Sequence, residues 1–378
     1  MNPGRIFAIA FKETLQVWRD PRSLAMALLM PVMQLGLLGY GVSLDIKRVE
    51  VCVHDQERSQ VSRELVERLT ASDWFRIAAK LRDERAVRSA MNSGDCVAAV
   101  TIPVNFSRIL ATTGKATVQT VFDATDVNTT NIATGYARGI VAIATADFEK
   151  RWAASHGLRM QTIGVVDLEP RVWFNEGLDS RNFIIPGVVA IILSLVGAQL
   201  TSLTVAREWE RGTMEQLIST PVTALEFMLG KLVPYFMIGL FDAAFCLLAA
   251  AFWFQVPFRG GLFTLILTTA LFTLVVLGIG YLVSVRVRDQ RGASQVALML
   301  TMLPTTLLSG FTFPIDQMPQ ALQAVTWVVY ARYYVTILRA VFLKGSTIVD
   351  LAAPVLALVV CAVVIMWAAA RSFHKRLD

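Results

Sequence analysis

The sequence predicts a mainly α-helical membrane protein, in which six apolar spans form a bundle and an α/β domain is inserted after the first span. Of its 378 residues, 55% are hydrophobic and 17% are charged, whereas soluble domains are about 25% charged. The mean hydropathy is +0.54. The apolar residues collect in blocks of about 20, the length that a helix needs to cross a bilayer. One long polar stretch, residues 45–182, alternates strand-like and helix-like segments.

Residues 1–22 are predicted to form an amphipathic helix in the membrane interface. Phe7, Phe11 and Trp18 recur near helical spacing, while Arg5 and Lys12 fall on another face. The segment has no hydrophobic core of a secretory signal. Pro21 is expected to end the helix.

Six spans follow from hydropathy and length. They are residues 23–44, 183–205, 232–256, 260–285, 292–313 and 351–370. With six spans both termini lie on one side, together with the basic short segments near 5–22, 207–231, 286–291 and 371–376. The positive-inside rule makes that side cytoplasmic, so residues 45–182 are expected outside. These loops also account for the net charge of +6. No basic stretch is interleaved with aromatic residues, so we expect no nucleic-acid binding.

A seventh apolar stretch, residues 321–343, carries Arg332 and Arg339. An arginine at a span centre costs about 2.5–3.5 kcal/mol on insertion scales, and a seventh span would export the basic C-terminal end. We therefore expect residues 314–350 to form an external re-entrant or interfacial helical hairpin. The two arginines would anchor it at the headgroup layer by snorkelling; gating of an exit is the alternative.

The polar stretch, residues 45–182, is predicted to be a small α/β domain. Strands are expected at 49–55, 75–81, 96–103 and 116–124, with another near 162–175, and helices at 59–70, 83–94, 105–114 and 128–155. Alternating elements favour a sheet with crossover helices. Cys52 and Cys96 lie near the starts of two strands. A disulfide between them can form outside the cell, but spacing does not decide it. No His or Cys cluster predicts a metal site.

The connector between the second and third spans, residues 205–231, carries local helix signals. Gly212 is expected to end the helix that continues the second span. Thr213 with Gln216, and Thr223 with Glu226, have the spacing of capping boxes. A short helix is therefore expected over 213–219. The residues alone allow two interpretations: a docking surface for a soluble partner, or a solvated connector whose charges fix orientation.

Three polar residues inside the spans are candidates for a substrate pathway. Asp242 lies in the middle of the third span, where a carboxylate is a functional candidate by default. It can face a cavity and attract a cationic substrate, or it can be a buried carboxyl bonded to a neighbouring helix. Gln34 and Gln199 are weaker candidates, because such residues more often make interhelical hydrogen bonds.

The connector resembles the hallmark cytoplasmic segment of ABC-2 type transporter permeases. The pattern E-x-E-R-G-T-x-E-x-L, with a later proline, falls on Glu208, Glu210, Arg211, Gly212, Thr213, Glu215, Leu217 and Pro221. Residues 12–22, 174–187, 308–319 and 331–345 resemble that family as well. Ala331 departs from it, because the family often has proline there, which leaves the turn at that position in doubt.

The resemblance implies a six-helix, type V exporter-like bundle of the bacterial drug-efflux type. Residues 213–219 would be a coupling helix that docks on a separate ABC ATPase, and two permeases, identical or paralogous, would pair with two ATPase subunits. ATP and Mg would bind to the ATPase, because this chain lacks a GxxxxGK[ST] motif. The chain itself would be no enzyme and would hold no cofactor.

By this resemblance the protein would export small amphiphilic or drug-like compounds across the cytoplasmic (inner) membrane, among whose lipids it lies. A periplasmic adaptor is a further expected partner for residues 45–182. One alternative is a permease for lipid or polysaccharide. A secondary transporter is another, although no repeated halves are found. A membrane sensor is the last, although the predicted cytoplasmic segments are short.

Overall fold

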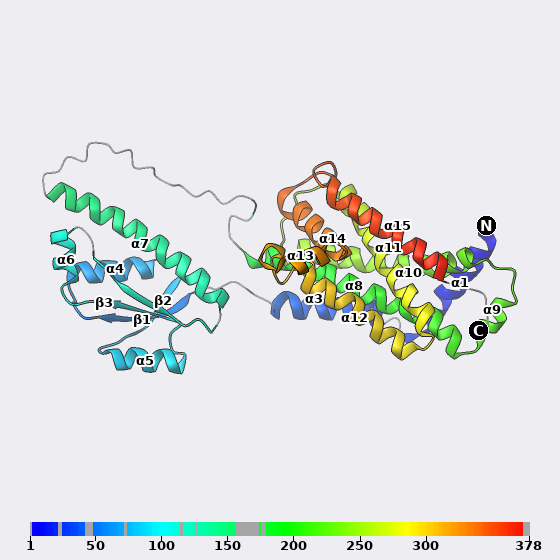
Figure 1. Ribbon diagram of the computed structural model, residues 1–378, viewed down its shortest axis with the longest axis horizontal. Helices are drawn as coiled ribbons and strands as arrows, with labels where there is room; N and C mark the ends of the chain where they lie inside the picture. The colour runs from blue at the N-terminus through cyan, green and yellow to red at the C-terminus, as the bar shows by residue number, and fades with distance from the viewer. Residues whose placement is uncertain are drawn as a thin grey trace. The chain divides into compact units, whose positions relative to one another are not determined.

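The computed structural model describes residues 2–21, 25–41, 48–71, 74–113, 116–125, 127–155, 174 and 179–372. These form two compact units (Figure 1). One unit is helical and combines Met1–Ser43 with Val172–Asp378. The other, Leu44–Arg171, contains the sheet.

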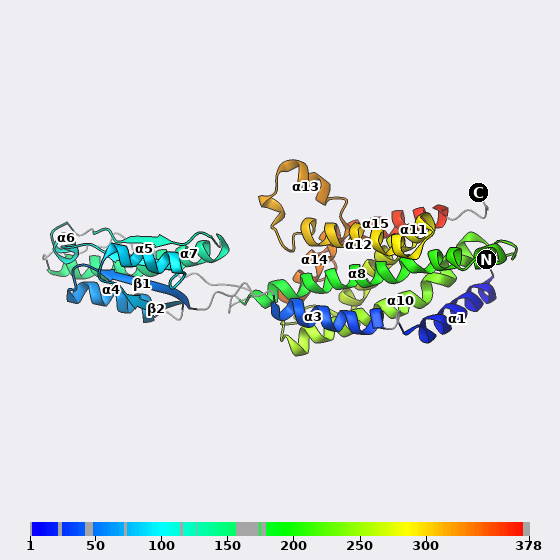
Figure 2. The same cartoon turned by 90° about the horizontal axis from the view of Figure 1, so that it is seen from below.

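The helical unit is built around one long, buried helix. Its elements are α1 (Pro3–Arg19), the π-helix η1 (Ala25–Leu29), α3 (Met30–Gly41), α8 (Ser180–Glu210), α9 (Thr213–Ile218), α10 (Ala224–Leu248), the π-helix η2 (Ala249–Trp253), α11 (Leu262–Val287), α12 (Gln290–Leu308), the 3-10 helix η3 (Ile315–Gln317), α13 (Gln320–Thr326), α14 (Tyr330–Arg339), the π-helix η4 (Ala340–Lys344) and α15 (Ala352–Ser372). Helix α8 packs against α3, α10, α11, α12 and α14 (Figures 1 and 2). Its apolar residues are buried by protein on nearly every side, so this helix forms the core of the unit.

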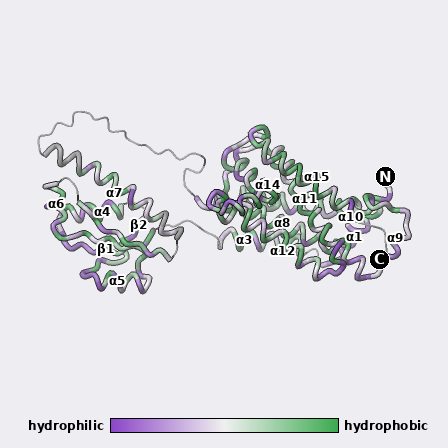
Figure 3. The backbone as a smooth tube through the Cα atoms, viewed as in Figure 1, coloured by the Kyte–Doolittle hydropathy of each residue, from purple (hydrophilic) through white to green (hydrophobic). Residues whose placement is uncertain are grey.

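Four helices in the described residues are long and apolar enough to cross a membrane. They are Ser180–Glu210, Ala224–Trp253, Leu262–Val287 and Ala352–Ser372, and they coincide with the predicted second, third, fourth and sixth spans. Long hydrophobic stretches follow these helices in Figure 3. The predicted first span has a shorter apolar helix, Ala27–Gly41. The predicted fifth span corresponds to α12, whose polar start, with Gln290, Arg291 and Gln295, lowers its hydropathy.

The connector confirms one predicted capping box and corrects the other. Thr223 accepts from the Glu226 amide, and the Glu226 carboxylate accepts from the Thr223 amide at 2.9 Å. Gly212 has φ +69° where α8 ends, a left-handed conformation that glycine adopts without cost. Thr213, however, begins α9 instead of capping it. Its hydroxyl donates to the carboxylate and main-chain oxygen of Glu208, because a carboxylate is the stronger acceptor.

Residues 314–350, where a helical hairpin was predicted, contain two short helices, α13 and α14. Helix α14 is deeply packed: it contacts α8, α11 and α15. The ring of Tyr334 stacks on Phe272 of α11 with centroids 3.9 Å apart. Helix α14 is therefore a component of the bundle core, which the arginines in its sequence did not suggest.

The second unit is a three-layer α/β fold. Its elements are β1 (Val49–Asp55), α4 (Gln60–Ala71), β2 (Phe75–Lys80), α5 (Glu84–Ser93), β3 (Ala98–Ile102), α6 (Phe106–Thr113), β4 (Gln119–Phe122) and α7 (Val127–Ser155). The strand order is β2-β1-β3-β4; β1 is parallel to β2 and β3, and β3 is antiparallel to β4. Four predicted strands and four predicted helices match within a few residues. The strand expected near 162–175 lies outside the described residues, except for Phe174.

Side chains of β1 alternate between the two faces of this sheet. Val49, Val51 and Val53 face a core that includes residues of α4, α6 and α7. Cys52 faces the opposite side, toward α5. There it forms a disulfide with Cys96, with Cα atoms 5.8 Å apart. The pairing that spacing left open is thus made in the folded chain.

Candidate functional site

The predicted connector residues meet helices from distant parts of the chain. One end of the helical unit brings together the C-terminal end of α8, the short helix α9, the N-terminal end of α10 and helix α1 (Figures 1 and 2). Met214 of α9 is buried in the bundle core, while Glu215, next to it, is exposed. Helix α9 therefore has one face fixed to the bundle and one face open.

A buried lysine joins three of these helices. The Lys231 ammonium, on α10, lies 2.7 Å from a carboxylate oxygen of Glu13 on α1 and 3.1 Å from one of Glu208 on α8. It also donates to the carbonyl oxygen of Thr204 at 3.1 Å. Lys231 is 1% exposed, so its charge depends entirely on these partners. Neither Lys231 nor Glu13 was a predicted site residue.

Glu208 is the centre of this network. Besides Lys231, its carboxylate accepts from the Lys12 ammonium at 2.7 Å and from the hydroxyl of Thr213, the first residue of α9. Two ammonium groups thus face two carboxylates, Glu13 and Glu208. We call these five residues, Lys12, Glu13, Glu208, Thr213 and Lys231, the buried charge network.

Further contacts hold α1 against the connector. The Arg5 guanidinium donates to the carbonyl oxygen of Pro221 at 2.6 Å. The main-chain amide of Asn2 donates to the Glu226 carboxylate at 2.6 Å. Glu226, which takes part in the capping box of α10, thus also binds the start of α1. At the other end of α1, Asp20 pairs with Arg207 at 3.2 Å. Helix α1 is fixed at both ends and in the middle.

The remaining motif residues lie on other sides of the connector. The Glu210 carboxylate accepts from the main-chain amide of Gln290 at 2.7 Å and from its side chain, which ties α8 to the start of α12. Arg211 is exposed and reaches no carboxylate of the described residues. The side chain of Leu217 lies outside the part that the structure describes.

The candidate pathway residues are separate from this end. Asp242 on α10 is 3% exposed, and its Oδ2 atom has no hydrogen-bond partner within the described residues. One turn away, Gly239 packs against Thr273 of α11, whose hydroxyl also lacks a partner there. Gln199 donates to Ser294 of α12 at 3.2 Å, an interhelical bond of the expected kind. Oε1 of Gln34 is buried without a described partner.

The two arginines of the hairpin both contact protein groups. Arg339 donates to the carbonyl oxygen of Gly310 at 3.0 Å, and its guanidinium lies 3.6 Å from the ring centroid of Phe183. Arg332 donates to Thr326 and lies 4.5 Å from the ring centroid of Trp327. The rings and the two oxygen acceptors compensate part of the cost of removing each guanidinium from water.

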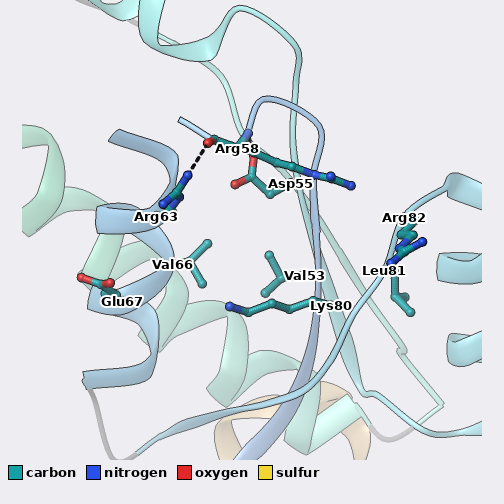
Figure 4. A pocket seen from close by; sticks show the side chains of 9 residues that line it. All are labelled: Val53, Asp55, Arg58, Arg63, Val66, Glu67, Lys80, Leu81 and Arg82. Atoms are coloured by element: carbon teal, nitrogen blue, oxygen red, sulfur yellow. Dashed lines mark hydrogen bonds between the residues drawn. The ribbon is translucent and has the colours of Figure 1, made fainter. Parts of the chain in front are cut away.

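The α/β unit contains a hollow of its own, of about 520 Å³ (Figure 4). It lies beside the ends of β1 and β2 and is lined by Val53, Asp55, Arg58, Arg63, Val66, Glu67, Lys80, Leu81 and Arg82. Arg63 donates to the carbonyl oxygen of Arg58 at 3.1 Å. Nearby, burial raises the pKa of Glu57, but hydrogen bonds from Ser107 outweigh it and leave that pKa below its usual value. No role for this hollow was predicted.

The apolar helices indicate a multi-pass membrane protein. The chain belongs to the ABC-2 family transporter proteins, whose pattern it matches over residues 21–371. The resemblance seen in the connector is thereby confirmed.

Curated relatives cover nearly the whole chain. The "Probable multidrug ABC transporter permease YbhS" of Escherichia coli (strain K12) is 39% identical over 376 residues, 99% of this chain and 98% of that protein. The "Probable multidrug ABC transporter permease YbhR" of the same organism is 28% identical over 344 residues, 91% of each chain. The "Inner membrane transport permease YhhJ" is 27% identical over 301 residues, 78% of this chain and 77% of that protein.

Proposed function

We propose that this chain is the membrane subunit of an ATP-driven exporter that moves small amphiphilic or drug-like compounds outward across the cytoplasmic membrane. Membership of the ABC-2 family supports the class. The names of YbhS and YbhR, which mention multidrug transport, support the substrate type. The coupling mechanism is supported by the buried charge network, which lies near the end of α8 and the starts of α9 and α10.

The network gives α9 a rigid connection to the bundle. Thr213 begins α9 and binds Glu208, and Glu208 shares Lys231 with Glu13. Opposite charges attract strongly where water is excluded, so these groups resist separation. A displacement of α9 would therefore move α1, α8 and α10 together. In our proposal α9 is the coupling helix, and its exposed Glu215 faces the ATPase.

The energy source lies on a separate subunit in this proposal. The 378 residues contain no GxxxxGK[ST] motif, so ATP and Mg would bind to the ATPase. A second permease, identical or paralogous, would complete the pathway, and the polar points Asp242, Gln34 and Gln199 would line it. The unpartnered oxygen of Asp242 supports a preference for cationic compounds.

The proposed topology has six spans, with both termini and α9 in the cytoplasm. The four long apolar helices, α3 and α12 would supply the spans. Residues 45–182 and the hairpin at 314–350 would then lie outside, where Arg332 and Arg339 would hold the hairpin near the headgroups. The disulfide between Cys52 and Cys96 supports this side, because disulfides persist in the periplasm and are rare in the cytosol. An adaptor would reach the α/β unit there.

Transport by reconstituted protein tests the proposal. The full chain would be placed in proteoliposomes with an ABC ATPase that co-purifies with it, and movement of a cationic dye would be followed with and without ATP. We expect ATP-dependent transport from the side of the ATPase to the opposite side. Lys231→Met should lower the number of dye molecules moved per ATP hydrolysed. Movement of lipid or polysaccharide instead of dye would favour the alternative substrates.

A further inference from the structure

A second hollow, of about 760 Å³, lies in the helical unit between the ends of α1 and α8 and the start of α12. Its walls include Arg207 of α8, Arg211 directly after α8, Arg291 of α12, Asp20 after α1, and two leucines, Leu203 and Leu298. Hollows of 300–1,000 Å³ hold small molecules in proteins. No residue of the buried charge network lines this hollow, so the role proposed for the network does not account for it.

The charges of the described residues around the hollow leave one positive charge in excess. Asp20 pairs with Arg207 at 3.2 Å, and Arg207 is only 6% exposed. Glu210 lies close enough to Arg291 to interact with it electrostatically, although its own hydrogen bonds go to Gln290. Arg211 has no carboxylate partner among the described residues. Among the described residues that line the space, three are arginines and one is an acid, Asp20. Glu210 acts on Arg291 from outside the lining, so one positive charge is in excess, a balance that suits a ligand with one negative charge.

The hollow also joins an apolar surface. Leu203 and Leu298 line the hollow as well, and each lies nearer the middle of its helix, α8 or α12, than the arginines do. Four residues beyond Leu298, on the same side of α12, Met302 is 40% exposed. Arg288 stacks on Trp209 at this end, with its guanidinium 4.6 Å from the ring centroid. Tryptophan is enriched at the boundary between membrane and water.

We propose that this hollow binds an anionic phospholipid of the surrounding leaflet. The phosphodiester would lie between Arg211 and Arg291, with the buried Arg207 behind it, because guanidinium groups match phosphate oxygens in geometry and charge. The acyl chains would follow Leu203 and Leu298 onto the exposed side of α12. The lipid would thus join α8 to α12 beside the contact between Glu210 and Gln290. This inference needs no ATPase and is independent of the proposed transport function.

Lipid association with the purified full chain tests the site. The chain would be reconstituted in phosphatidylcholine bilayers containing spin-labelled phosphatidylglycerol or spin-labelled phosphatidylcholine, and the motionally restricted fraction would be measured. We expect the wild type to prefer phosphatidylglycerol. R211Q/R291Q should lower that preference about fivefold for each arginine removed. R211K/R291K keeps the charge and should keep most of the preference.

A matched control separates this site from general attraction by basic residues. Arg286, near the end of α11, and Arg371, near the end of α15, lie outside the hollow. R286Q/R371Q removes the same charge, and we expect it to leave the preference unchanged. Equal losses in both double variants, or no loss in R211Q/R291Q, would overturn the proposal. So would displacement of labelled phosphatidylglycerol by millimolar inorganic phosphate or ATP, because the site would then bind a soluble anion.

Discussion

The ammonium nitrogen of Lys231 lies 2.7 Å from a carboxylate oxygen of Glu13, and each side chain is 1% exposed. The two residues are 218 positions apart in sequence, so the contact exists only in the folded chain. Removing one member of a buried ion pair is costly because the other charge stays buried without compensation. This buried ion pair therefore holds helix α1 firmly against α10.

Lys231→Met should destabilise the helical unit by about 3–5 kcal/mol, the usual cost of breaking a buried pair. Thermal unfolding of the purified full chain, followed by tryptophan fluorescence, measures the loss. E13Q/K231M should be more stable than K231M alone, because Glu13, which loses its ion-pair partner in K231M, is then neutral, whereas Glu208 keeps Lys12. Lys80→Met, which removes an exposed lysine of β2, is the control. Equal melting temperatures for K231M and K80M would contradict a structural role for the network.

Replacing Glu210 and replacing Glu215 should impair the transporter in different ways. Glu210 contacts Gln290 within the chain, so Glu210→Gln should lower the melting temperature and the dye moved per ATP while the ATPase still binds. Glu215 is exposed on α9, so Glu215→Lys should weaken capture of the ATPase by the tagged permease without changing stability.

Glu84→Lys reverses an exposed charge on α5 of the other unit and is the control for capture. If neither Glu210→Gln nor Glu215→Lys changed ATP-dependent efflux, these acids would not be coupling determinants.

Local signals explain the parts of the fold that the sequence predicted well. Strand β1 was expected at 49–55 and spans Val49–Asp55, because alternation and β-branched residues act over neighbouring positions. The capping box of Thr223 and Glu226 formed for the same reason. Gly212 ended α8 as expected, since few other residues adopt its positive φ cheaply.

Contacts between distant residues account for what the sequence did not predict. Nothing near Lys231 indicated that Glu13 would neutralise it. Thr213 had the spacing of a cap, but a carboxylate five residues earlier took its hydroxyl instead. Hydropathy likewise could not reveal that Arg339 would find Phe183 and the Gly310 carbonyl inside the bundle. Tertiary partners changed the outcome in each case.

Asp242→Asn should lower export of cationic compounds about tenfold, which corresponds to about 1.4 kcal/mol of lost attraction. The physical reason is that the carboxylate oxygen Oδ2 is buried without a partner in the described residues, so a cation is its natural counter-charge. Stability should not fall, because the amide of the variant carries no charge that burial would penalise. Export of a neutral amphiphile by the same variant is the internal control. Unchanged export of the cationic compound would end the substrate role of Asp242.

Loss of the disulfide should loosen the α/β unit. Cys52 and Cys96 are separated by 44 positions, and closing a loop of that length stabilises a fold by about 4 kcal/mol in the chain-entropy model. C52S/C96S, or wild type treated with reductant, should therefore be cut faster by protease between residues 48 and 155. C361S, which replaces a cysteine of α15, should behave as wild type.

The reactivity of Cys52 and Cys96 shows on which side of the membrane the α/β unit lies. If residues 45–182 lie outside, both cysteines should resist maleimide in freshly lysed cells until a reductant is added. Labelling without reductant would contradict that placement.

Gly280→Ala should destabilise the contact between α8 and α11. A Cβ atom at Gly280 would overlap the carbonyl oxygen of Ala198 and the hydroxyl of Thr201, and would lie 3.0 Å from the Ala198 Cα atom. The threonine can rotate, but the Ala198 backbone belongs to the most buried helix of the bundle and cannot move alone. Overpacking of this kind costs about 1–3 kcal/mol. Gly36→Ala on α3 is the matched control, because a Cβ atom there meets no atom within 4 Å. It should be neutral or slightly stabilising, since alanine favours a helix by about 1 kcal/mol over glycine. If both variants melted at the same temperature, α8 and α11 would not be packed as closely as this glycine requires.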